Sequence, residues 1–236
     1  MSSFAVGPFG SVTSSAPDIQ TSPAPGAERV PVVHAVTNDE IVLRADFLDR
    51  ARLVMQAGGA RVAVHVRAPR VGGRKLYYLA SAIARLQDET GAWAVVNDRA
   101  DVALASGARG VQLTSRSLAA SDVTTFAPDL WVGASVHSSQ DAQVAKAGGA
   151  RWIVAGHATS DNSEGDVDRG TAFIERLAAD PTAPIIAIGG VRPEDVSRIV
   201  AAGAYGVAVI RGVWNTSDAG AAVIEYLSAH GTPGGR

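Results

Sequence analysis

The sequence contains no cysteine. This absence excludes disulfide bonds, thiolate nucleophiles and cysteine-ligated zinc or iron–sulfur centres. Runs of like charge are also absent and the formal net charge is −2, so no global field would attract nucleic acid or an anionic membrane. No apolar run approaches the roughly 20 residues needed to span a bilayer, and the N-terminus lacks a secretory signal pattern. We therefore predict a soluble cytoplasmic protein with no nucleic-acid or membrane partner.

Residues 1–29 differ in composition from the rest of the chain. They are rich in serine, proline, glycine and alanine, contain few large aliphatic residues and show no hydrophobic period. Such a segment cannot bury enough apolar area to offset the entropy cost of ordering it. We predict a low-complexity, disordered tail over residues 1–29 and one folded domain over residues 30–236.

From residue 30 onwards, short apolar runs alternate with segments of helical spacing. Most runs are nearly continuous in Val, Ile and Ala, as in parallel strands that are covered on both faces. The eight runs span residues 30–37, 61–67, 93–98, 110–114, 130–136, 152–157, 184–190 and 206–212. Helical spacing is found over residues 47–59, 76–87, 141–149, 172–180, 194–203 and 221–231.

This alternation has two main structural solutions, a closed (β/α)8 barrel and an open doubly wound sheet. A dinucleotide-binding sheet of the second kind requires a G-x-G-x-x-G turn after its first strand, and residues 34–42 contain no glycine. Glycine-marked loops after the last two strands favour the barrel. We therefore predict an α/β fold, a single-domain (β/α)8 TIM barrel.

In such barrels the functional residues lie at the carboxyl ends of the strands. Here those ends carry polar side chains and glycines, which we expect to converge on one mouth. The candidate substrate-binding residues are Arg67, Asn97, Gln112, Ser135, His137, Gly189, Gly190, Arg211 and Gly212.

The glycines after the last two strands indicate a phosphate site. Gly189 and Gly190 follow the seventh run, and Arg211 and Gly212 follow the eighth. Glycine lets an anion approach backbone N–H groups closely, and an arginine adds positive charge. The alternative is that Gly189 and Gly190 only form a turn into the helix that begins near Pro193.

The five histidines offer one catalytic candidate. His157 lies where the sixth run opens into a polar loop, although a histidine at a strand end is often purely structural. His65 either packs in the core or shares a face with Arg67, and His34 and His230 show no functional pattern. No histidine pair has the spacing of a zinc-binding helix, so we predict no metal site, and Asp98 is interpreted as part of a helix start.

The order and spacing of the segments are similar to those of one known family. From Val32 to Trp214 the chain resembles the thiamine phosphate synthase/TenI superfamily. The resemblance is carried by HAVTND, VHVRAP, VVNDRADVALASGARGVQLTS, VGASVHSSQDAQVAKAGGARWIVAGH and IIAIGGVRPEDVSRIVAAGAYGVAVIRGVW. It implies a (β/α)8 barrel and a role in thiamine biosynthesis.

Two activities of this superfamily compete. Its synthases join an aminopyrimidine diphosphate to a thiazole phosphate, with magnesium bridging the diphosphate. Their third strand ends in Asn-Asp, matched here by Asn97 and Asp98. Their fourth strand continues as G-V-H-L-G-Q-E-D, whose last acid is a second metal ligand, and Ser117 stands at that position here. A Thr- and Lys-bearing loop follows their sixth strand, whereas residues 157–170 contain no lysine.

The TenI branch, by contrast, is similar to this sequence at VQL, SVHS and the Gly156–His157 pair. That resemblance implies a thiazole tautomerase, an isomerase that aromatises a carboxylated thiazole phosphate, with His157 as catalytic acid and base. An imidazole suits proton transfer near neutral pH. Arg67 is the candidate for the substrate carboxylate. We expect no cofactor, a phosphorylated thiazole substrate, thiazole synthase as the upstream enzyme, and a homo-oligomer as one possible assembly.

Three alternatives remain open at this point. The first is a thiamine phosphate synthase with an altered metal site, which would require magnesium. The second is a non-catalytic protein that binds thiazole or thiamine phosphates as a regulator. The third is another barrel enzyme with a phosphate-bearing ligand, because a fold does not fix a function.

Overall fold

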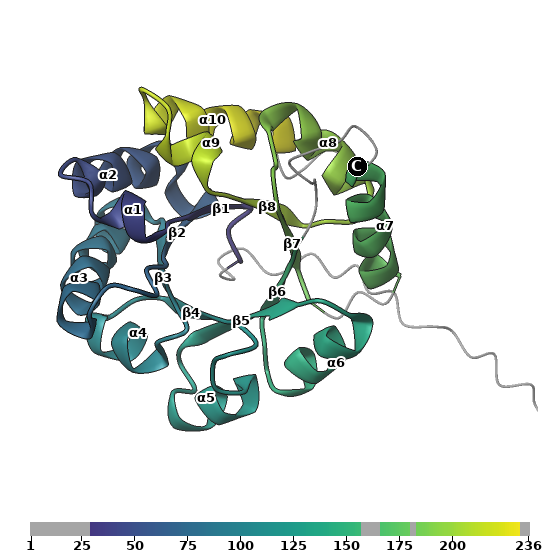
Figure 1. The fold of residues 1–236 in the computed structure, drawn as a ribbon, viewed down its shortest axis with the longest axis horizontal. Coiled ribbons are helices and arrows are strands. Elements are labelled where there is room, and N and C mark those ends of the chain that lie inside the picture. The colour runs from purple at the N-terminus through teal and green to yellow at the C-terminus, as the bar shows by residue number, and fades with distance from the viewer. Residues whose placement is uncertain (1–28, 157–165, 180–182, 232–236) are drawn as a thin grey trace, which may run out of the picture.

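The chain folds into a closed barrel of eight parallel strands in the order β1 to β8, surrounded by helices (Figure 1). The computed structural model describes residues 29–156, 166–179 and 183–231, and the tail predicted over residues 1–29 lies almost wholly outside them. The predicted (β/α)8 barrel is confirmed. The strands are β1 (Val33–Val36), β2 (Val62–Val66), β3 (Trp93–Asn97), β4 (Gly110–Leu113), β5 (Trp131–Val136), β6 (Trp152–Ala155), β7 (Ile185–Ile188) and β8 (Gly206–Val209).

The helices lie outside the ring of strands (Figure 1). An apolar stripe on each longer helix packs against the sheet, as the helical spacing predicts. The helical elements are α1 (Asp39–Val42), α2 (Phe47–Gly58), the 3-10 turn η1 (Gly59–Arg61), α3 (Gly73–Thr90), α4 (Ala100–Ser106), α5 (Ala120–Phe126), α6 (Ser139–Ala147), α7 (Asp166–Ala178), α8 (Pro193–Ala201), α9 (Arg211–Trp214) and α10 (Ala219–His230).

The barrel interior is filled by large side chains opposite small ones. Trp152 on β6 is fully buried, and its indole lies against two glycines of neighbouring strands. A Cβ atom at Gly133 would lie 2.0 Å from Trp152 Cε2, and one at Gly110 would lie 3.1 Å from Trp152 Cη2. Only glycine therefore fits at Gly133 without displacing the indole.

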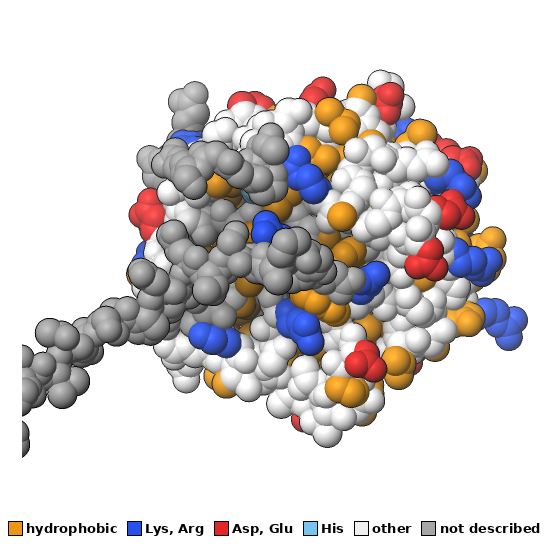
Figure 2. Space-filling model, turned by 180° about the vertical axis from the view of Figure 1, so that it is seen from behind, with side chains coloured by type: hydrophobic (Ala, Val, Ile, Leu, Met, Phe, Trp, Pro, Cys, Tyr) orange, Lys and Arg blue, Asp and Glu red, His pale blue; other side chains and the backbone are white. Residues whose placement is uncertain are grey.

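Two cation–π contacts lie on residues from the amino-terminal part of the barrel strands. The guanidinium carbon of Arg151 lies 4.4 Å from the centre of the Trp131 ring, and that of Arg109 lies 5.6 Å from the centre of the Trp93 ring. The two tryptophan rings contact each other edge to face. Figure 2 views the molecule from behind and shows Lys and Arg side chains near the middle of that face, with Asp and Glu closer to its edge. Among the described residues, tryptophan rings and the arginines stacked on them therefore pack this end of the barrel.

A buried tryptophan fixes the loop that follows β8. Trp214 at the end of α9 donates its Nε1–H to the carbonyl oxygen of Val36, at 2.9 Å, and its ring lies 5.6 Å from that of Phe47. The hydrogen bond ties α9 to the end of β1, so the backbone at Arg211 and Gly212 is held against the carboxyl ends of the strands. Within the described part of the chain, no helix is long and apolar enough to cross a bilayer.

Candidate active site

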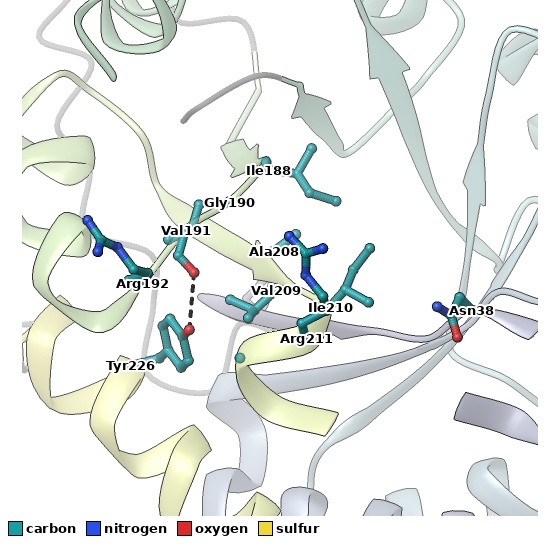
Figure 3. Close-up of a pocket in the computed structure, with 12 residues that line it drawn as sticks. Asn38, Ile188, Gly190, Val191, Arg192, Ala208, Val209, Ile210, Arg211 and Tyr226 are labelled. Atoms are coloured by element: carbon teal, nitrogen blue, oxygen red, sulfur yellow. Dashed lines mark hydrogen bonds between the residues drawn. The ribbon is translucent and has the colours of Figure 1, made fainter. Parts of the chain in front are cut away.

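A cavity of about 540 Å³ opens at the carboxyl ends of β7 and β8 (Figure 3). Residues from both strand ends line it, together with Asn38 from the end of β1. The structure therefore brings together the four residues that the sequence analysis selected as a phosphate site, Gly189, Gly190, Arg211 and Gly212. A volume of this size accommodates a small phosphorylated ligand.

Both glycines after β7 have left-handed backbone angles. The φ angle is 121° at Gly189 and 62° at Gly190. Side chains are unfavourable at such angles, and the absence of Cβ lets a ligand approach the backbone closely. The backbone conformation alone therefore explains why glycine occupies both positions, whether or not an anion binds there.

At position 212 glycine is required for a steric reason. A Cβ atom there would lie 2.1 Å from the hydroxyl oxygen of Tyr226 on α10. That hydroxyl donates to the carbonyl oxygen of Val191 at 3.1 Å (Figure 3). Burial raises the pKa of Tyr226 to about 12. Tyr226 therefore remains a neutral hydrogen-bond donor that closes one wall of the cavity.

Two arginines belong to the cavity but point in different directions. In Figure 3 the Arg211 side chain extends toward Ile188, whereas that of Arg192 turns the other way. Arg192 forms ion pairs with Glu194 and Asp195 on α8, at 3.3 and 3.4 Å. Arg211 is therefore the better placed of the two to contact an anion in the cavity.

A second polar group lies after β3, where Asp98 adopts a φ angle of 65°. Among the described residues it is the one non-glycine residue with a positive φ. Its Oδ1 accepts hydrogen bonds from the hydroxyls of Thr114 and Ser117, both at 2.5 Å. Residues held in such backbone conformations concentrate at functional sites. Asp98 was matched to the Asn-Asp pair of the synthases in the sequence, but it was left out of the predicted site because the tautomerase was favoured.

Asp98 fits one kind of magnesium site. In proteins Mg²⁺ is held by one or two carboxylates together with phosphate oxygens of the substrate and water. Asp98 supplies one carboxylate, and Ser117 supplies a neutral oxygen where the family pattern has an acid. No cluster of three or more His, Cys, Asp or Glu side chains suited to a metal occurs in the described ranges. These residues fit an ion that arrives with a phosphorylated ligand better than a resident metal.

His34 and His65 form a buried pair in the barrel interior, each 1% exposed. His34 Nδ1 lies 2.8 Å from His65 Nε2, and His65 Nδ1 lies 3.2 Å from Asn97 Oδ1. Burial lowers the pKa of His34 to about 4. Burial and the neighbouring His34 ring hold the pKa of His65 well below its usual value. The two rings are therefore neutral near pH 7, and His34, which showed no pattern in the sequence, belongs to a network that ends at a candidate site residue.

Gln112 and Ser135 form a second network beside the first. The amide of Gln112 accepts from Trp152 Nε1 at 2.8 Å and donates to Ser135 Oγ at 3.1 Å. Gln112 is thus engaged with protein groups at both ends of its amide. Because Ser135 Oγ accepts this bond, its hydroxyl proton points away from Gln112 and can donate to another group. Ser135 lies near the end of β5 and is half-buried.

The remaining candidates lie on loops. Arg67 follows β2 and is half-buried, and its backbone N–H donates to Thr37 Oγ1 at 2.9 Å. His137 follows β5 and is exposed, and its backbone N–H donates to Asp141 Oδ2 at 2.9 Å. His157, the predicted catalytic residue, lies outside the described residues.

These features define a (β/α)8 barrel with a glycine-lined cavity at the ends of its last two strands and a strained aspartate after the third. Comparison with known proteins identifies the family. The family model described as thiamine monophosphate synthase matches residues 33–213. The chain belongs to this family, in which synthases and TenI proteins are grouped together.

Relatives in sequence and a solved structure carry names for the same activity. The thiamine-phosphate synthase of Methanoculleus marisnigri is 37% identical over 193 residues, covering 80% of this chain and 90% of the relative. That of Laribacter hongkongensis is 33% identical over 201 residues, covering 84% and 95%. The structure of thiamine phosphate pyrophosphorylase from Pyrococcus furiosus superimposes with a TM-score of 0.73 at 27% identity, covering 84% of this chain and 95% of that one.

These relatives overturn the predicted activity. The expectation of a thiazole tautomerase, an isomerase of the TenI branch, is wrong, because the relatives are named as synthases. That expectation rested on the Gly156–His157 pair and on two departures from the synthase pattern. One departure, Ser117, leaves Asp98 in place with two hydroxyl partners, so it alters the pattern without removing the carboxylate.

Proposed function

We propose that this protein is a transferase of thiamine biosynthesis, a thiamine phosphate synthase that joins an aminopyrimidine diphosphate to a thiazole phosphate. The observation that carries the proposal is the strained Asp98 at the same end of the barrel as the glycine-lined cavity, in a chain 37% identical to a protein named thiamine-phosphate synthase. The reaction has two phosphorylated substrates. The Asp98 carboxylate suits the diphosphate, through magnesium, and the cavity suits the monophosphate of the thiazole.

The cavity at β7 and β8 suits the phosphate of the thiazole substrate. Gly189, Gly190 and Arg211 border the same space, so backbone amides and a guanidinium are the groups proposed to bind the phosphate. Hydrogen bonds from charged donors to phosphate are roughly twice as strong as neutral ones. This end of the mouth therefore anchors the substrate by its phosphate arm and leaves the thiazole ring over the centre of the barrel.

The opposite side of the mouth suits the diphosphate. Asp98 would hold magnesium together with diphosphate oxygens, and Arg67, which follows β2, is a candidate guanidinium for the same diphosphate. Thr114 and Ser117 orient the Asp98 carboxylate through its Oδ1. Magnesium, when bound, neutralises charge that develops on the diphosphate as it leaves.

The reaction depends on the alignment of its two substrates more than on proton transfer. The thiazole nitrogen forms a bond to the methylene carbon of the pyrimidine while the bond from that carbon to the diphosphate oxygen breaks. The nitrogen lone pair is already free, so no general base is required. Aligning the two substrates and stabilising the leaving group are the terms that a protein supplies in such a step.

A direct assay tests the proposal. Purified protein is incubated with hydroxymethylpyrimidine diphosphate, thiazole phosphate and magnesium, and thiamine phosphate is measured by oxidation to its fluorescent thiochrome derivative. We expect product that depends on both substrates, and reduced product from Asp98→Asn. Asp122→Asn, on α5, is the matched control for the same loss of one charge and should retain wild-type turnover. Absence of product from folded wild-type protein would refute the proposal.

A further inference from the structure

A chain of hydrogen bonds runs through the barrel interior from its amino-terminal side to the carboxyl end of β3. His34 Nε2 lies 2.9 Å from the carbonyl oxygen of Pro31. His34 Nδ1 lies 2.8 Å from His65 Nε2, and His65 Nδ1 lies 3.2 Å from the side-chain amide of Asn97. The chain therefore links a backbone carbonyl, two imidazoles and one amide at the mouth.

The Pro31 carbonyl fixes the direction of every bond in this chain. A carbonyl oxygen only accepts, so His34 Nε2 carries a proton. A neutral imidazole carries one proton, so His34 Nδ1 is an acceptor and His65 Nε2 must donate to it. His65 Nδ1 is then also an acceptor and needs a donor from Asn97. The only donor in that side chain is Nδ2.

The opposite amide orientation conflicts with these protons. With Oδ1 facing His65 Nδ1 at 3.2 Å, two acceptors would meet unless one ring carried a second proton. That ring would be an imidazolium in a site where both rings are 1% exposed. Among the described residues, the hydrogen-bond partners of their ring nitrogens are each other, a carbonyl oxygen and a neutral amide. Burial of such a charge is costly, and burial lowers the pKa of His34 to about 4. The oxygen and nitrogen of an amide have nearly the same shape, so rotation of the amide satisfies all four groups.

We propose that His34 and His65 are positioning residues that hold Asn97 with its amide nitrogen toward His65 and its carbonyl oxygen toward the mouth. The second atom of the amide reaches solvent, because Asn97 is 8% exposed and contributes no enclosed, unpartnered atom among the described residues. Asn97 thus presents an acceptor, held in place by two histidines that are themselves buried.

This orientation determines what Asn97 can bind. A carbonyl oxygen accepts from amino or hydroxyl groups and repels phosphate oxygens, which only accept. If the proposed function holds, on which this step rests, the Asn97 oxygen accepts a hydrogen bond from an amino or hydroxyl group on the organic part of a substrate. The diphosphate is left to Asp98 with its metal and to arginine. Asn97 therefore contributes to specificity by excluding an anion from the centre of the mouth.

Nitrogen-15 NMR of the ligand-free wild-type protein tests the orientation without any assay. We expect both rings as neutral tautomers protonated on Nε2 at pH 7.5, and a coupling across the hydrogen bond between Asn97 Nδ2 and His65 Nδ1. A proton on His65 Nδ1, or an imidazolium on either ring at that pH, would overturn the proposal. Because this readout needs no turnover, a failed synthase assay with the expected spectrum would refute the proposed function alone.

One isosteric variant provides a second test. Asn97→Asp removes the only donor, so we expect it to force a proton onto His65 Nδ1 and convert one ring to the imidazolium at pH 7.5. Asn215→Asp introduces the same charge at an exposed site and should leave both rings unchanged. An unaltered His65 spectrum in folded Asn97→Asp protein would contradict the proposal.

Discussion

Ser117 Oγ donates a 2.5 Å hydrogen bond to Asp98 Oδ1. The resemblance to the synthases places an acid where Ser117 stands, so a neutral donor here occupies the position of a second metal ligand. The hydroxyl orients the remaining carboxylate but adds no negative charge. A magnesium ion in this protein would depend more on the diphosphate of the substrate than in a two-carboxylate site.

Restoring the acid should strengthen magnesium use. We expect Ser117→Asp to lower the magnesium concentration for half-maximal synthase activity by about tenfold, because a second carboxylate joins Asp98. Ser117→Ala removes the hydroxyl without adding charge and serves as the control. A magnesium titration of thiamine phosphate formation checks this, and equal midpoints for the two variants would argue against a metal at Asp98.

Loss of the Arg211 guanidinium should weaken anion binding. We expect Arg211→Gln to raise the dissociation constant for thiazole phosphate by about tenfold, the loss of a charge-assisted hydrogen bond of about 1.4 kcal/mol. Arg192→Gln is the matched control, since that side chain turns away and pairs with Glu194 and Asp195. Calorimetric titration measures both. An unchanged affinity in Arg211→Gln would remove this residue from the phosphate site.

Gly212 should be coupled to Tyr226. A methyl group at Gly212 would lie 2.1 Å from the Tyr226 hydroxyl, so we expect Gly212→Ala to lower the free energy of unfolding by about 2 kcal/mol. Tyr226→Phe removes that hydroxyl, and the double variant should be more stable than the sum of the two single effects allows. Urea denaturation of all four proteins provides the cycle. Additive effects would show that the contact is not the cause.

The buried histidines make stability depend on pH in a defined direction. The unfolded chain protonates His34 near pH 6.5, whereas the folded protein keeps it neutral down to about pH 4. Between these values the unfolded state binds more protons, so stability is complete above pH 6.5 and falls as the pH is lowered. The full loss from His34 alone is about 3 kcal/mol. Urea midpoints should be level from pH 7 to 8.5 and fall from pH 6.5 to 5, and a flat profile to pH 5 would contradict the neutral pair.

Much of the fold is predictable from this sequence because its strands are continuous apolar runs. Short helices were harder: α4 and α5 span seven residues each and carry mostly Ala, Ser, Thr and Asp, with too few large apolar side chains to show a period. The place of the cavity at the ends of β7 and β8 was predictable because the glycines at φ 121° and 62° are a visible pair in the sequence; that it binds a phosphate stays a prediction.

Other parts of the site depend on contacts between distant residues. His34 and His65 are 31 positions apart, and an all-buried strand does not reveal which side chains face the interior. Asp98 was interpreted as part of a helix start because its backbone strain has no sequence signature. The activity was mistaken for a tautomerase because Ser117 replaces a metal-ligating acid of the synthases, because residues 157–170 lack their lysine, and because of the Gly156–His157 pair. The relatives named as synthases overturn that interpretation.

Phosphorus-31 NMR spectra of the wild-type protein with both phosphorylated substrates and magnesium follow the synthase reaction itself. We expect the diphosphate ester signals to decline while inorganic diphosphate and thiamine phosphate appear in equal amounts. Persistence of both substrate spectra, in the presence of protein that still binds thiazole phosphate, would contradict the proposed function.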